Sequence, residues 1–188
     1  KGELVEKNYR EALKWYKLSA NQGLKLAQFN LALMYENAEG VSENFKEAAR
    51  LMVLSADQGF ANAQYRLGVY YFSGKGITQD ISESIRLWRL SANQGNVSAN
   101  LALGLMYNNG EGVEQNEEEA IRYFKIAANQ GNEIAKQQLF AITGREYEVK
   151  SNEVSPLHRE EGRLSERYQE LGLGTNYKEN LDKEELAN

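Results

Sequence analysis

The sequence repeats itself with a period of 36 residues. The tripeptide Asn-Gln-Gly or Asp-Gln-Gly recurs at this step, and alanine, leucine and tyrosine recur with it at fixed positions. The recurrent residues are Gly23, Gly59, Gly95 and Gly131; Ala20, Ala56, Ala92 and Ala128; Ala27, Ala63, Ala99 and Ala135; Leu31, Leu67, Leu103 and Leu139; and Tyr35, Tyr71 and Tyr107. A fixed period of this kind is typical of solenoids, in which each unit packs on its neighbours. We therefore expect a stack of similar units.

Each unit has the pattern of two helices. The first begins with a capping-box pattern, in which an Asn or Asp accepts from a free N–H and a Glu three residues later reaches back to the cap. The pairs are Asn8 and Glu11, Asn44 and Glu47, Asp80 and Glu83, and Asn116 and Glu119. Apolar and small residues then follow helical spacing, in Ala12, Trp15, Tyr16, Ser19 and Ala20. The recurrent glycine can end this helix in the left-handed conformation.

The second helix of each unit contains a column of small residues, Ala32, Gly68 and Gly104, which lets neighbouring helices approach closely. A short loop follows it, as in Gly110-Glu111-Gly112-Val113. We therefore predict an all-α fold built from helix-turn-helix units. We expect Trp15, Trp88 and the tyrosine column to pack in the core.

Residues 120–131 and 99–113 resemble the helices and the loop of the Sel1-like repeat family, relatives of the tetratricopeptide repeat. The resemblance covers roughly residues 2–143. It implies a right-handed α-α superhelical solenoid with a non-catalytic role in protein–protein interaction. It also implies a bacterial protein, and favours an exported or periplasmic location over the cytoplasm. Some secreted members carry a disulfide in each repeat, whereas this chain has no cysteine.

The repeat pattern predicts the organisation of the chain. We expect 1–7 to end a truncated preceding repeat, 8–43, 44–79 and 80–115 to be Sel1-like repeats, 116–143 to be a partial terminal repeat, and 144–188 to be a C-terminal extension. A degenerate lead-in is the alternative for 1–7. Phe140 replaces the small residue, so it would block a standard next repeat. Ser155-Pro156, followed by a stripe of Leu157, Leu164, Tyr168 and Leu171, predicts a capping helix over 156–171.

The composition argues against several kinds of chemistry. The net charge of −5 disfavours nucleic-acid binding, and no apolar run approaches the roughly 18 residues of a membrane span. The one histidine, His158, is expected to be a surface residue. The loops lack a phosphate-binding pattern, and no Ser-x-x-Lys motif is present. We therefore expect no enzyme activity, no metal and no cofactor.

One stripe on the first helices gives a candidate binding surface. Its positions recur at spacings of 0, +4, +7 and +11 in each unit and are mostly basic. The candidate partner-binding residues, which we call the basic ridge, are Arg10, Lys14, Lys17, Arg50, Val53, Arg86, Arg89, Arg122 and Lys125. We expect these helices to line the concave groove and to bind a protein or peptide there, with an acidic segment as the candidate partner. The alternative is that the arginines only pair with glutamates three residues earlier on the same helix.

Two functions remain open at this point. The first is a scaffold or adaptor that binds a partner along the groove. The second is an immunity or inhibitor protein that neutralises a secreted toxin by tight binding, which predicts a single partner. Settings that the resemblance implies include bacterial signalling, host interaction and envelope assembly, as well as membrane-protein quality control in eukaryotes.

Overall fold

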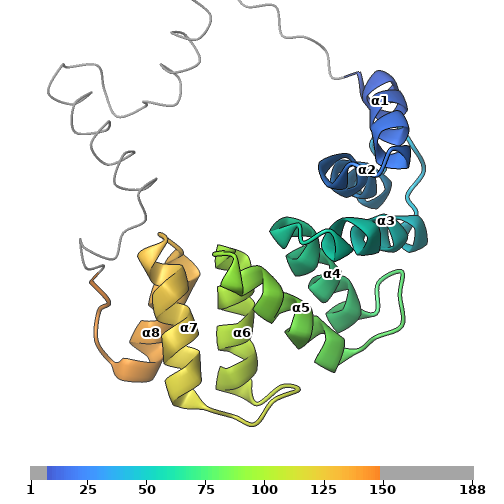
Figure 1. The fold of residues 1–188 in the computed structure, drawn as a ribbon. Helices are drawn as coiled ribbons and strands as arrows, with labels where there is room; N and C mark the ends of the chain where they lie inside the picture. The colour runs from blue at the N-terminus through green and yellow to red at the C-terminus, as the bar shows by residue number, and fades with distance from the viewer. Residues whose placement is uncertain (1–7, 149–188) are drawn as a thin grey trace, which may run out of the picture. The chain divides into compact units, whose positions relative to one another are not determined.

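The computed structural model describes residues 8–148, which form eight α-helices and no β-strand (Figure 1). The first helices of the repeating units are α1 (Tyr9–Asn21), α3 (Phe45–Asp57), α5 (Ile81–Asn93) and α7 (Glu117–Asn129). The second helices are α2 (Lys25–Asn37), α4 (Ala61–Ser73), α6 (Val97–Asn109) and α8 (Glu133–Thr143). The all-α prediction is confirmed. The chain divides into two compact units, Lys1–Phe124 and Lys125–Asn188.

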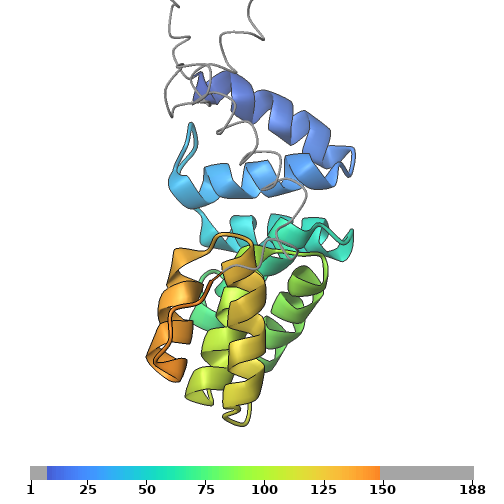
Figure 2. The same ribbon diagram turned by 90° about the vertical axis from the view of Figure 1, so that its left-hand side faces the viewer.

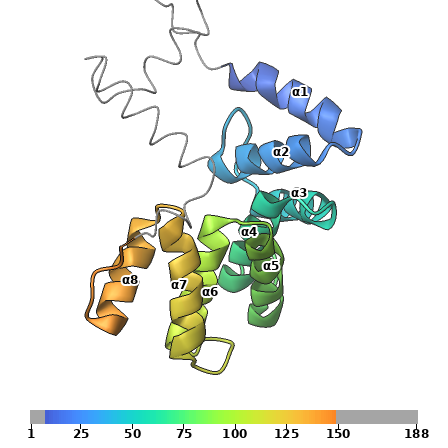
Figure 3. The same cartoon turned by 60° about the vertical axis from the view of Figure 1, so that its left-hand side comes forward.

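In the first compact unit, helices that are adjacent in sequence pack against one another. α1 packs on α2, α3 on α4 and α5 on α6. α2 also packs on α3, and α4 on α5, so these second helices each contact two first helices (Figure 2, Figure 3). This is the nearest-neighbour packing that holds a repeat array together.

The predicted N-caps of the first helices are present. The caps Asn8, Asn44, Asp80 and Asn116 accept a hydrogen bond from the backbone N–H three residues later, at 2.9–3.1 Å. The reciprocal half of the capping box differs from the prediction in α3, α5 and α7. The backbone N–H groups of Asn44, Asp80 and Asn116 donate instead to the carbonyls of Tyr35, Tyr71 and Tyr107, at 2.9–3.0 Å. The glutamates of these helices are therefore available for other partners.

The turn between the paired helices depends on the recurrent glycine. Gly59 has φ +75°, and the other three recurrent glycines have φ between +84° and +85°. The N–H of Gly59 donates to the carbonyl of Ala56 at 2.9 Å, which closes the end of α3. Since residues with a Cβ rarely adopt this conformation, the left-handed stop predicted for this column is confirmed.

Large side chains of the first helices pack into the column of small residues on the second helices. A Cβ atom added to Gly68 would lie 2.5 Å from Nε1 of Trp88, and one added to Gly104 would lie 2.5 Å from Cε1 of Phe124. Trp88 and Phe124 are both buried. The close helix approach predicted from the small column is therefore confirmed.

Buried polar side chains also join neighbouring repeats. The fully buried Ser91 donates from Oγ to the carbonyl of Ala61 at 2.7 Å. Ser55 makes the equivalent bond to the carbonyl of Lys25 at 2.8 Å. Equivalent glutamine pairs also connect repeats, with Gln58 donating to Gln28 and Gln94 donating to Gln64, both at 2.7 Å. Because buried polar groups must be paired, these bonds fix which faces of the helices meet.

The core prediction is confirmed for Trp88 and is wrong for Trp15. Trp88 is 3% exposed, whereas Trp15 is 54% exposed. Leu51 and Leu87, which occupy the position of Trp15 in later repeats, are buried. Each belongs to a first helix that packs on the second helix before it, and among residues 8–148 no second helix precedes α1. The tyrosines of the recurrent column are partly buried.

Three predictions fall outside the described residues. They are the lead-in 1–7, the capping helix over 156–171 and the surface position of His158.

Candidate functional site

The described part of the chain contains neither a cluster of metal-ligating side chains nor a membrane-spanning helix. Within residues 8–148, no group of three or more His, Asp or Glu side chains could hold a metal ion. No helix in the same range is long and apolar enough to cross a membrane. The candidate sites are therefore surfaces, and two of them follow from the arrangement of the helices.

The residues of the basic ridge are almost all exposed. The eight cationic members lie on the surface of α1, α3, α5 and α7. Val53 is half-buried and packs against the core cluster of the first repeats. Less of its side chain is therefore available to a partner than the sequence pattern indicated. Lys125 belongs to the second compact unit and is exposed there. The assignment of these residues to partner binding stays a prediction.

Three arginines of the ridge form ion pairs within their own helices. Both nitrogens of the Arg50 fork donate to Glu47, at 2.9 and 2.7 Å. Arg86 binds Glu83 in the same way, at 2.7 and 2.6 Å, and Arg122 approaches Glu119 to 2.7 Å. The hydrogen bonds from Arg50 lower the pKa of the Glu47 carboxyl, and the charges of Arg50 and Lys17 lower it further. These arginines are therefore largely neutralised before a partner arrives.

The other cations of the ridge are less compensated. The ammonium of Lys17 lies 5.9 Å from the ring centre of Tyr35, and the ammonium of Lys14 lies 5.6 Å from that of Trp15. Arg89 donates to the hydroxyl of Tyr107 at 2.8 Å. These contacts are to neutral rings and a hydroxyl, so the charge of each cation remains available to an acidic partner.

A second surface lies on the second helices and was not predicted. A pocket of about 220 Å³ opens between α2, α4 and the start of α6. We call it the second-helix groove, and its lining residues are Phe29, Leu33, Asn62, Tyr65, Arg66, Asn96 and Ser98. Asn96 donates from its side-chain amide to Oδ1 of Asn62 at 3.0 Å, which joins two repeats along the rim. A pocket of this size is too small for a typical ligand site and matches one large side chain.

A partly buried ionic cluster joins the same helices. Arg66 approaches Glu36 to 3.2 Å, and the hydroxyl of Tyr70 donates to the same carboxylate at 2.8 Å. Tyr70 is 1% exposed, and burial followed by the hydrogen bond to Glu36 raises the pKa of its hydroxyl above the ordinary range. The phenol therefore stays a neutral donor. The cluster holds Arg66 at the groove, with its charge paired.

The sequence contained a signal for the second-helix groove. Phe29 and Tyr65 are separated by the repeat period, as are Leu33 and Val69. All four are apolar or aromatic, and all remain partly exposed in the structure. Two aligned columns of this kind on one helix face indicate a surface, but periodicity alone does not separate them from core columns.

The sequence model described as "Sel1 repeat" matches residues 1–24, 25–60, 61–96 and 97–132. The chain belongs to the Sel1 repeat family. The three longer matches begin at the second helices α2, α4 and α6, so each Sel1 repeat in this division contains a second helix and the first helix that follows it. A solenoid can be divided at either turn without any change in the fold.

Solved structures of Sel1 repeat proteins support the assignment. The chain is 32% identical to a Sel1 repeat protein from Oxalobacter formigenes, with a TM-score of 0.71, over 80% of this chain and 62% of that one. It is 33% identical to c5321, a protective antigen of uropathogenic Escherichia coli with an SLR fold, with a TM-score of 0.71, over 81% of this chain and 33% of that one. This Sel1 repeat chain therefore spans only part of the length of both proteins.

A more distant structure agrees in fold. Cysteine-rich protein B of Helicobacter pylori is 20% identical, with a TM-score of 0.56, over 74% of this chain and 100% of that one. A search of curated proteins gave no match. All three of these solved structures are of bacterial proteins. Sel1 repeat proteins generally act in protein–protein interaction, and the family typically provides non-catalytic scaffolds.

Proposed function

We propose that this chain is a non-catalytic scaffold that binds a segment of a partner protein in the second-helix groove. The observation that carries the proposal is the lining of the groove by three consecutive second helices. A segment that lies across α2, α4 and α6 would meet a similar set of side chains every repeat. Such repetition suits an extended peptide, because its own side chains also recur at a fixed spacing.

The chemistry of the groove indicates what the segment carries. Phe29, Leu33 and Tyr65 offer partly exposed apolar surface at its floor. Asn62 and Ser98 are exposed at its rim and can bond the backbone of a peptide. The charge of Arg66 is already paired with Glu36. A peptide with a large apolar side chain and a free backbone fits this arrangement better than an acidic one.

The basic ridge is the second candidate surface, and the observation in its favour is a set of cations that form no salt bridge within residues 8–148. Lys14, Lys17 and Arg89 are exposed and contact only rings and a hydroxyl among the contacts described above. An acidic partner would meet these three first. Charges at an exposed surface raise the association rate and the selectivity more than the affinity.

A capture experiment with two variants separates the two surfaces. The partner would be captured with the wild-type protein and then measured with Asn62→Glu/Ser98→Glu in the groove and with Lys14→Glu/Arg89→Glu on the ridge. We expect the groove variant to lose at least tenfold in affinity and the ridge variant to keep it within about threefold. The opposite order would place the contact on the ridge. Both variants must keep the helical circular dichroism of the wild type.

The same measurement separates a scaffold from a toxin inhibitor. A scaffold is expected to bind one or more partners with moderate affinity and to leave their activities unchanged. An inhibitor is expected to bind one partner far more tightly and to abolish its activity in a stoichiometric titration. If both variants keep the affinity of the wild type, neither surface is the contact.

A further inference from the structure

The face of α8 differs from the corresponding face of α2 and α4. In α2 and α4, Gln28 and Gln64 accept a hydrogen bond from a glutamine of the next repeat. α8 has Lys136 at this position, and its ammonium pairs with Glu133 at 2.6 Å. A lysine has no acceptor, so it cannot make the bond that joins α2 and α4 to their neighbours.

The small column also ends at α8. Gly68 and Gly104 make room for Trp88 and Phe124 of the following first helices. α8 carries Phe140, which is 53% exposed. A ring from another repeat has no room where the Phe140 ring already lies. Two of the positions that receive a following repeat are thus altered, yet the face still exposes a large apolar side chain.

The chain after α8 turns back along this face. Gly144 ends the helix with φ +66°. The hydroxyl of Tyr147 then donates to Oδ1 of Asn129 at 2.8 Å, which ties the returning segment to the end of α7. Since Asn129 lies just before the start of α8, the segment runs from the end of α8 toward its beginning.

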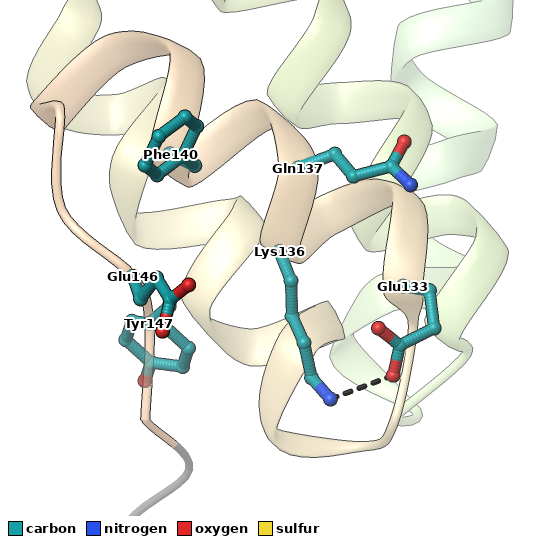
Figure 4. Close-up of a pocket in the computed structure, with 6 residues that line it drawn as sticks. All are labelled: Glu133, Lys136, Gln137, Phe140, Glu146 and Tyr147. Atoms are coloured by element: carbon teal, nitrogen blue, oxygen red, sulfur yellow. Dashed lines mark hydrogen bonds and ion pairs between the residues drawn. The ribbon is translucent and has the colours of Figure 1, made fainter.

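The returning segment leaves a pocket open beside α8. Its volume is about 420 Å³, and it lies between α8 and the segment that carries Glu146 and Tyr147 (Figure 4). Glu133, Lys136, Gln137 and Phe140 line the helix side, at the spacing of one helical face. The pocket is large enough for several apolar side chains.

We infer that residues 156–171 of the same chain dock as an amphipathic helix in this pocket, here called the α8 pocket, and cover Phe140. The sequence pattern of that segment matches the pocket. Leu157, Leu164, Tyr168 and Leu171 fall within an arc of about 60° on a helix. Ser155-Pro156 suits the beginning of a helix. Docked in the pocket, the apolar side chains of the stripe would cover the exposed ring of Phe140.

The lengths of the segments allow this docking. The nine residues from 148 to 157 can span up to about 30 Å, whereas α8, with 11 residues, is about 16 Å long. Gly162 lies inside the segment and weakens an isolated helix by about 1 kcal/mol relative to alanine. A helix of this length with an internal glycine is marginal in water, so its formation depends on the contact with α8. The proposal is independent of the function proposed above.

A disulfide-trapping experiment in the full-length chain tests this inference. The chain has no cysteine, so introduced pairs are its only thiols. Gln137→Cys would be combined with Glu161→Cys, which lies about 40° from Leu157 on the helix, or with Glu166→Cys, which lies about 180° from it. We expect the first pair to form a disulfide within one chain at least tenfold faster than the second. Equal rates, or disulfides mainly between two chains, would overturn the proposal.

Hydrogen exchange provides a second test that does not depend on cysteines. Leu164→Asp/Tyr168→Asp alters the stripe, and Gln169→Asp alters a position about 120° away as the matched control. We expect the stripe variant to exchange the amides at the end of α8 at least tenfold faster and the control to leave them unchanged. Unchanged exchange in the stripe variant would show that residues 156–171 do not cover α8.

Discussion

A Cβ atom on Gly68 would lie 2.5 Å from Nε1 of Trp88, so the indole occupies the space that a larger residue at position 68 would need. Nε1 also donates to the carbonyl of Tyr65 at 3.1 Å, which holds the ring in place. The equivalent residues between α2 and α3 are Ala32 and Met52, both fully buried. Where alanine (Ala32) replaces glycine (Gly68) on the second helix, methionine (Met52), which is more flexible, replaces tryptophan (Trp88) on the following first helix.

We predict that Gly68→Ala destabilises the protein despite the higher helix propensity of alanine. Overpacking lowers the free energy of unfolding by about 1–3 kcal/mol. The higher helix propensity of alanine raises it by about 1 kcal/mol. The expected net loss of stability is therefore up to about 2 kcal/mol. Urea denaturation would measure it. In a Trp88→Met background, which copies the Ala32 and Met52 pair, the loss should shrink or change sign. An equal loss in both backgrounds would contradict the size matching.

Tyr70→Phe is expected to reduce the free energy of unfolding by about 1.5–3 kcal/mol, because the substitution removes a hydrogen bond to a charged group. The bond lost is the one from the Tyr70 hydroxyl to Glu36, at 2.8 Å. Tyr71→Phe is the matched control, since the Tyr71 hydroxyl makes no side-chain hydrogen bond within residues 8–148. Equal effects of the two substitutions would show that the cluster around Glu36 adds no stability.

Ser91→Ala is expected to cost about 0.5–1.5 kcal/mol, the usual contribution of one hydrogen bond. Ser91, in α5, is fully buried and bonds the preceding helix α4 through the carbonyl of Ala61. Ser73→Ala serves as control, because Ser73 is exposed and bonds only carbonyls of its own helix. Thermal unfolding of the two variants, recorded together, would show a lower Tm for Ser91→Ala only.

The Glu47–Arg50 pair predicts a weak dependence of stability on pH. The hydrogen bonds from Arg50 lower the pKa of Glu47 in the folded state. The pair therefore stabilises the fold at pH values above the unfolded pKa, and this contribution disappears as the pH falls through the folded pKa. Glu47→Gln should remove up to about 1 kcal/mol at pH 7 and almost nothing at pH 2. Glu43→Gln, in the loop before α3, is the control, and a loss in Glu47→Gln that persisted at pH 2 would contradict the ionic origin.

The regular parts of this fold could be predicted from the sequence because they depend on local chemistry. The cap at Asn44, the stop at Gly59 and the small column at Gly68 each repeat at 36 residues, and each is present in the structure. A cap needs only one side chain and a nearby N–H, and a left-handed stop needs only the absence of a Cβ. Because these local features recur every 36 residues, the same pair of helices forms in each repeat.

Tertiary packing decided the features that periodicity could not separate. Trp15 and Leu51 share one column, yet the first is exposed and the second is buried. Within residues 8–148 a second helix packs on the helix of Leu51 and none precedes the helix of Trp15, so the difference lies in the neighbouring helix. In the same way, the use of the Glu47 carboxylate by Arg50 depends on the Tyr35 carbonyl, which takes the cap N–H.

The sequence by itself determined the helices, their ends and the family, because these follow from the residue types at each position of the period. Only the tertiary structure placed a groove on α2, α4 and the start of α6, buried Leu51 but not Trp15, and exposed Phe140 on α8. The physical reason is that exposure depends on contacts between helices. The period of the sequence shows which side chains occupy equivalent positions in the repeats. The packing of the helices decides whether each of them contacts a neighbouring helix or solvent.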